Sequence, residues 1–172
     1  MNAFRPDELI RVLHLHEVRF VLVGGLAATL HGSAHPTFHV DITPDPTPAN
    51  LARLSTALRA LDARVRVDGI PDGLPFAHDA SSLAHITVLN LVTRAGDLDI
   101  ALHPAGIAAF ADWDAHAIDL VVLGVPVRVA RLDEIIRSKE AAGRDNDRVT
   151  LPLLRALRDR LRRDQQAQQK QR

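Results

Sequence analysis

The sequence contains no cysteine and no tyrosine, and only 3% of its 172 residues are aromatic. Without cysteine, the chain has no disulfide framework, no zinc finger and no thiol nucleophile. With so few aromatic side chains, nucleic-acid binding by stacking bases on several exposed rings is disfavoured. The core is therefore expected to be aliphatic, built from leucine, valine, isoleucine and alanine.

Long hydrophobic runs are absent as well. No apolar run approaches the roughly 20 residues that span a bilayer. The N-terminal segment carries acidic residues among its apolar ones and lacks the apolar core of a signal peptide. We therefore expect a soluble, cytoplasmic protein without membrane contact. A hydrophobic content of 47% and this length are typical of one globular domain.

The formal net charge is zero, but the charge is unevenly distributed. Residues 155–172 hold seven lysines and arginines against two acidic residues. Such a basic segment indicates either a solvated helix or a contact with RNA. Nothing along the chain resembles an interdomain linker. We predict one domain over residues 1–163, followed by a disordered tail over 164–172, which lacks large apolar residues.

Hydrophobic periodicity predicts an α/β fold in which helices flank a small mixed β-sheet. Helices are predicted over 6–16, 26–30, 48–62, 105–113, 132–142 and 151–163. Strands are predicted over 20–23, 37–42, 63–67, 86–92, 98–102, 120–123 and 125–129, the last four as two hairpins. Glycines and prolines over 68–76 predict a loop.

The segment from Phe20 to Asp41 combines a strand, a glycine pair, a short helix and a second strand. Gly24 and Gly25 would let the backbone approach a phosphate closely, and the helix after them offers free N–H groups to an anion. A glycine pair alone fits an ordinary strand-to-helix turn equally well. The dinucleotide-binding fingerprint and the phosphate-binding P-loop pattern are both absent.

The motif as a whole is more specific. It comprises Gly24-Gly25, Ala27, His31-Gly32, Pro36-Thr37 and an acid-bearing strand, and it continues with GDLDI at 96–100 and IIRSKEAAGRDND at 135–147. This combination resembles the signature of the nucleotidyltransferase superfamily, closest to toxin-type (AbiEii-like) enzymes of type IV toxin–antitoxin pairs. The resemblance extends from about residue 17 to about residue 160.

The resemblance implies a polymerase β-like core and transfer of a nucleoside monophosphate from a nucleoside triphosphate to an acceptor. Acceptors in this superfamily include transfer RNA, and a cognate antitoxin protein is the implied partner. Gly24 and Gly25 would bind the nucleotide. Lys139 and Asp147 correspond to active-site residues, and Arg144 is a further candidate for a phosphate contact. By sequence alone, Lys139 and Arg144 would equally fit ordinary surface charges.

Carboxylates supply the metal-binding chemistry that this activity requires. Residues i and i+2 of a strand project from the same face, so two acids at that spacing can hold divalent ions. Asp41 is one such acid, and Asp99, on a strand after a hairpin turn, is the candidate third carboxylate. Asp97 shares the face of Asp99 but lies nearer the turn. Mg²⁺ accepts such oxygen ligands, and Mn²⁺ is the alternative ion.

The sequence departs from the superfamily pattern at two positions. His39 stands where the first acid of the pair is usual, and His35 where an arginine is usual. A neutral imidazole binds metal without adding negative charge and suits softer ions than Mg²⁺. Three readings follow: one metal ion on Asp41 and Asp99, a softer ion that also binds His39, or a catalytically silent module that retains nucleotide binding.

Two further alternatives are weaker. An antibiotic nucleotidyltransferase with a cationic substrate would call for an acidic pocket, and the sequence shows no added acidic cluster. His31, His35 and His39 are spaced by four, as zinc ligands on one helix would be. Gly32 and Pro36 interrupt any such helix, so we expect His31 to pack in a turn instead.

Overall fold

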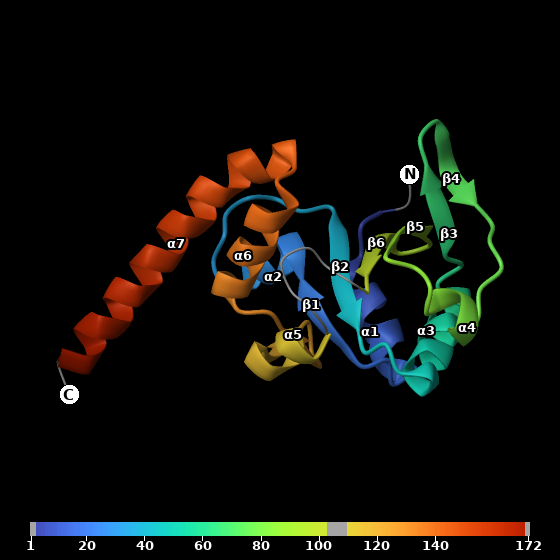
Figure 1. The fold of residues 1–172 in the computed structure, drawn as a ribbon, viewed down its shortest axis with the longest axis horizontal. Helices are drawn as coiled ribbons and strands as arrows, with labels where there is room; N and C mark the ends of the chain where they lie inside the picture. The colour runs from blue at the N-terminus through green and yellow to red at the C-terminus, as the bar shows by residue number, and fades with distance from the viewer. Residues whose placement is uncertain (1–2, 103–109, 171–172) are drawn as a thin grey trace.

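A computed structural model describes residues 3–102 and 110–170, which form a mixed eight-stranded sheet with flanking helices (Figure 1). The strands are β1 (Phe20–Val23), β2 (His39–Pro44), β3 (Arg64–Val67), β4 (Ile70–Leu74), β5 (Val88–Thr93), β6 (Gly96–Ala101), β7 (Ile118–Val122) and β8 (Val125–Val129). Their order in the sheet is β4-β3-β5-β6-β2-β1-β8-β7. The strand β2 is central, antiparallel to β1 and parallel to β6.

The helices pack around this sheet. They are α1 (Pro6–Leu15), α2 (Gly24–Leu30), α3 (Pro48–Ala60), α4 (Ala80–Leu83), α5 (Phe110–His116), α6 (Leu132–Ala142) and α7 (Asp145–Lys170). The helix α1 contacts α3 and the strands β2, β6 and β8, whereas α2 contacts β1, β2 and α6. The helices α6 and α7 pack against each other, and the C-terminal part of α7 projects away from the sheet (Figure 1).

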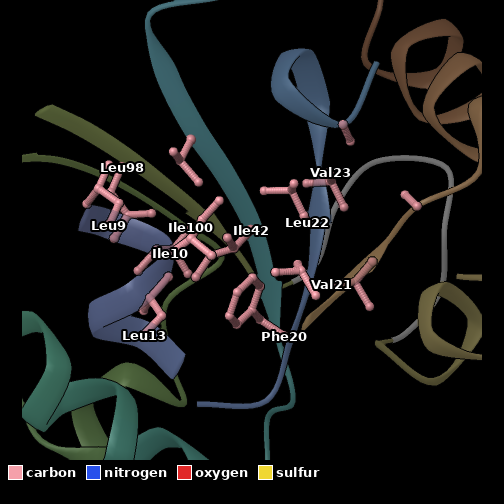
Figure 2. Close-up of a cluster of buried hydrophobic side chains, with 14 of the residues drawn as sticks. Leu9, Ile10, Leu13, Phe20, Val21, Leu22, Val23, Ile42, Leu98 and Ile100 are labelled. Carbon is pink, nitrogen blue, oxygen red and sulfur yellow. The ribbon is translucent and has the colours of Figure 1, made fainter. Parts of the chain in front are cut away.

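An aliphatic core lies between α1 and the sheet, as the composition predicts. Figure 2 shows part of it, with Leu9, Ile10 and Leu13 of α1, Phe20 and Leu22 of β1, Ile42 of β2, and Leu98 and Ile100 of β6. Val21 and Val23, also buried, alternate with Phe20 and Leu22 and lie on the other face of β1. Because side chains alternate along a strand, the residues next to Ile42 on β2 and those next to Leu98 and Ile100 on β6 belong to the opposite face of the sheet. That opposite face carries the polar residues of β2 and β6.

The structure adds a strand that the sequence does not predict. The segment expected to be a loop, 68–76, contains β4, which pairs antiparallel with β3 through Val65 with Leu74 and Val67 with Ile70. Gly69, at φ +79°, permits the tight turn between them. Pro71 is tolerated because β4 is the edge strand of the sheet. The loop prediction was therefore wrong.

The last helix is much longer than predicted. The helix expected over 151–163 begins at Asp145 and runs to Lys170, with Pro152 inside it. Asp145 and Asp147 favour its first turn because they carry negative charge at the positive end of the helix. Residues 164–170, for which disorder was expected, are helical and exposed. Glutamine, lysine and arginine are good helix formers, so a helix already under way continues through them.

Other boundaries shift less. The helix α2 begins at Gly24 and not at Leu26, and β2 begins at His39 and not at Thr37. Part of the helix predicted over 105–113 lies outside the described residues, which resume within it at Phe110. The helix α6 ends at Gly143, at φ +59°, as predicted.

Candidate active site

The parallel pairing of β2 and β6 brings Asp41 and Asp99 together. The register sets Asp41 opposite Asp99 and His39 opposite Asp97. Along both strands the apolar residues are buried on the α1 side, and these four polar residues are only partly buried on the other. Ligand atoms of His39, Asp41 and Asp99 all lie within 4.8 Å of one another, which is close enough for one metal ion to contact all three.

The ring of His39 lies near both carboxylates of this cluster. Its Nε2 lies 3.2 Å from Oδ2 of Asp41 and 4.0 Å from Oδ2 of Asp99. The hydrogen bond to Asp41 raises the pKa of His39, although burial of the ring acts in the opposite direction. Burial raises the pKa of Asp99, and the nearby guanidinium of Arg66 opposes that rise. The ring and the two carboxylates are thus electrostatically coupled.

The two glycines are required by how closely β1 and α2 approach this cluster. Gly24 has φ +67°, and a Cβ there would lie 2.1 Å from Oδ2 of Asp41. The amide of Gly25 donates a hydrogen bond of 3.3 Å to that same oxygen. A Cβ on Gly25 would lie 2.8 Å from Oγ1 of Thr37. The glycine pair therefore brings the amide of Gly25, in the first turn of α2, against the carboxylate of Asp41.

Arg66 of β3 is a part of the site that sequence reasoning missed. Its Nη1 donates to Oδ2 of Asp97 at 2.7 Å, and its Nη2 donates to Oδ1 and Oδ2 of Asp99 at 2.8 and 3.1 Å. The approach depends on strand order, because β3 reaches β6 only across β5. The alternation Arg64-Val65-Arg66-Val67 was the available signal, since it puts both arginines on one face.

Lys139 and Asp147 also come together, at the turn between α6 and α7. Nζ of Lys139 lies 2.7 Å from Oδ1 of Asp147, whose side chain is buried. The backbone amide of Arg144 donates to the other oxygen of Asp147 at 3.3 Å, while the Arg144 side chain is exposed. The left-handed Gly143 turns the chain so that Lys139 of α6 and Asp147 of α7 meet. In this structure Asp147 therefore neutralises Lys139.

The other histidines of the spaced set do not join the metal cluster. Within the described residues, the group that can hold a metal includes His39 but neither His31 nor His35. Nε2 of His31 lies 2.8 Å from the carbonyl oxygen of Ala130, which links the end of α2 to the segment before α6. His35 is exposed in the loop before β2. A three-histidine site is thus absent from residues 3–102 and 110–170.

Comparison with known proteins shows which solved structures share the fold of this chain. No protein-family model and no curated protein sequence matches this chain. Among solved structures, the lincosamide antibiotic adenylyltransferase LnuA, with lincomycin bound, has a TM-score of 0.58 at 12% identity, covering 91% of this chain and 99% of its own. A provisionally assigned nucleotidyltransferase from Thermotoga maritima has a TM-score of 0.55 at 15% identity, covering 88% and 94%.

The solution structure of the antibiotic-resistance factor ANT(2'')-Ia is also similar, with a TM-score of 0.54 at 14% identity, covering 96% of this chain and 94% of that chain. At such identities the likeness shows the fold alone. The predicted α/β fold with a nucleotidyltransferase-like core is confirmed. Among the described residues, no helix combines the length and apolar character needed to cross a bilayer.

Proposed function

We propose that this protein is a metal-dependent nucleotidyltransferase that moves a nucleoside monophosphate from a nucleoside triphosphate to an acceptor. The observation that carries the proposal is the cluster of His39, Asp41 and Asp99, whose ligand atoms lie within 4.8 Å of one another beside the glycine turn. The nucleotidyltransferase-like fold supports it.

The donor set fits a divalent ion. Two carboxylates and one imidazole offer oxygen and nitrogen ligands, and imidazole favours Mn²⁺ or a softer ion over Mg²⁺. When bound, such an ion polarises the phosphates of the nucleotide and activates the attacking hydroxyl. The hydrogen bonds of Asp41 to Gly25 and of Asp99 to Arg66 orient both carboxylates before the ion arrives.

Other residues would position the nucleotide. Gly24 and Gly25 would bind the nucleotide through the backbone of their turn, against which Asp41 and Thr37 pack because neither glycine carries a side chain. Lys139 would turn from Asp147 to the triphosphate, as a point charge on a flexible stem. The exposed Arg144 would add a second phosphate contact. The contact between α6, which carries Lys139, and α2, which begins at Gly24, supports this arrangement.

The acceptor and the biological role come from the sequence resemblance. It supports transfer RNA as the acceptor and a toxin held in check by an antitoxin protein. Two other candidates each have an observation in their favour. A small-molecule acceptor is favoured by the fold likeness to LnuA, an antibiotic adenylyltransferase. A silent nucleotide-binding module is favoured by His39 in place of an acid.

Nucleotide transfer tests the proposal. Purified protein is incubated with each α-labelled nucleoside triphosphate, total transfer RNA, and Mg²⁺ or Mn²⁺, with Asp41→Asn as the matched variant. We expect label on RNA, lost in Asp41→Asn. Label on the protein or on an added antibiotic would identify a different acceptor but still support nucleotide transfer. Nucleotide binding without transfer to any acceptor would favour the silent module.

A further inference from the structure

We propose that the guanidinium of Arg66 acts as a built-in cation of the site, so that the site takes up one divalent ion, at His39, Asp41 and Asp99, and not a pair. This inference rests on the metal site proposed above and specifies its stoichiometry. Arg66 is a positioning residue in this account, because it acts through the two carboxylates that it holds.

The contacts of Arg66 place its charge where a second ion would need ligands. One terminal nitrogen contacts Asp97 at 2.7 Å, and the other contacts both carboxylate oxygens of Asp99, at 2.8 and 3.1 Å. Asp97 and Asp99 share one face of the sheet with His39 and Asp41 of β2, and Arg66 reaches them from the other side of β6, across β5. Arg66 therefore approaches Asp99 from the β5 side, whereas His39 and Asp41 lie on the β2 side, and it contacts both oxygens of that carboxylate.

The strand register fixes this arrangement. Val65 lies opposite Leu91 of β5, and Asn90 lies opposite Asp99 of β6. The strands β3 and β5 are antiparallel, so Arg66, which follows Val65, lies opposite Asn90, which precedes Leu91. Arg66, Asn90 and Asp99 therefore lie in one row across three neighbouring strands. Because that row is on the polar face of the sheet, the arginine has only to cross β5 to reach β6. A planar guanidinium can hold two carboxylates at once, which a lysine ammonium cannot match in geometry.

The charges are consistent with a single ion. Asp41, Asp97 and Asp99 together carry three negative charges when ionised, and Arg66 supplies one positive charge, which leaves two. One divalent ion neutralises that remainder, while His39 binds as a neutral ligand. A second divalent ion would have to displace Arg66 or lie beside it with an excess of positive charge, at contact distances where such repulsion is strong.

The number of bound ions tests this inference without relying on activity. Mn²⁺ is titrated into the full chain and counted by the loss of the free-ion electron paramagnetic resonance signal. We expect one Mn²⁺ per wild-type chain and two in Arg66→Gln, because that variant frees Asp97 and an oxygen of Asp99. Arg64→Gln is the matched control: it lies on the same face of β3 and contacts the carbonyl of Gly73, at 3.4 Å, and it should retain one ion.

A second variant covers the case in which Arg66→Gln does not fold. Asp97→Asn should keep one ion per chain, because Asp97 contacts Arg66 and not the ion. Two ions in the wild type, with one lost in Asp97→Asn, would overturn the inference while leaving the nucleotidyltransferase proposal intact. One ion in Arg66→Gln with wild-type affinity would also overturn it. No ion in the wild type would overturn the proposed metal site itself.

Discussion

Gly24 and Asp41 are packed so closely that no side chain fits between them: a Cβ on Gly24 would lie 2.1 Å from Oδ2 of Asp41. The turn from β1 into α2 and the carboxylate of β2 therefore form one unit. Val23, just before Gly24, is also paired with Asp41 in the sheet, which holds the turn beside this carboxylate. The glycine motif and the candidate metal ligand are thus one structural feature.

We expect Gly24→Ala to displace Asp41 and to weaken metal binding. The residue has φ +67°, so alanine would also strain the backbone. Gly69→Ala is the matched control, because Gly69 has φ +79° and no atom within 4 Å of its added Cβ. Backbone strain alone costs about 1–2 kcal/mol. Urea unfolding should show a larger loss for Gly24→Ala, and calorimetry should show lost Mn²⁺ affinity for that variant only. Equal losses of stability with unchanged Mn²⁺ affinity in both would contradict the account.

The ion pair of Lys139 and Asp147 should stabilise the junction of α6 and α7. Asp147→Asn leaves the ammonium without its partner in a largely buried place, which should cost on the order of 2 kcal/mol in free energy of unfolding. The matched pair is Arg155 with Glu140, which joins the same two helices in an exposed position. Glu140→Gln should cost less than about 1 kcal/mol. Similar losses for both variants would show that burial of the Lys139 pair is energetically unimportant.

The metal preference should follow residue 39. With an imidazole at this position, Mn²⁺ should support more nucleotide transfer than Mg²⁺. His39→Asp restores an all-oxygen donor set and should move the preference towards Mg²⁺. His39→Asn, which removes the ring, is the matched control and should lose activity with either ion. An unchanged preference in His39→Asp would mean that His39 does not bind the metal.

Stability should depend on pH through His78. Burial lowers the pKa of His78, and the charge of Arg59 lowers it further, against the effect of Asp79. A lowered folded-state pKa means that the unfolded chain takes up the proton more readily. The stabilisation is then complete above pH 6.5, the ordinary value, and is lost as the pH falls below it. The variant His78→Asn should keep the contact to Ser55, whose Oγ lies 2.9 Å from Nδ1 of His78. The thermal unfolding midpoint should fall less steeply between pH 7 and pH 5 in His78→Asn than in the wild type. An equal dependence on pH in both would contradict the assignment.

The sequence predicts much of the fold because hydrophobic periodicity depends on local spacing. Strand 20–23, helix 132–142 and the hairpin at Ala95-Gly96 all follow from alternation, caps and turns within a few residues. The strand β4 was missed because Pro71 and Gly73 are atypical of strands, and only its edge position makes them tolerable. The helix α7 was predicted too short because its end has no apolar stripe, although its residues favour the helical state.

The same distinction applies to the site. Asp41 and Asp99 could be paired from the sequence because both lie on strands beside a recognisable motif. Lys139 and Asp147 were joined by the resemblance, and the turn at Gly143 explains why they meet. Arg66 was not foreseeable, since its contact with Asp99 depends on the order of β3, β5 and β6. Strand order is a long-range property that local spacing does not encode.

Anomalous diffraction from crystals grown with Mn²⁺ and a non-hydrolysable nucleoside triphosphate would show directly which residues hold the ion and the nucleotide. We expect one Mn²⁺ peak bound by Nε2 of His39 and by carboxylate oxygens of Asp41 and Asp99, with nucleotide phosphate as a further ligand. A nucleotide bound elsewhere, or a crystal with no Mn²⁺ among these three residues, would contradict this expectation.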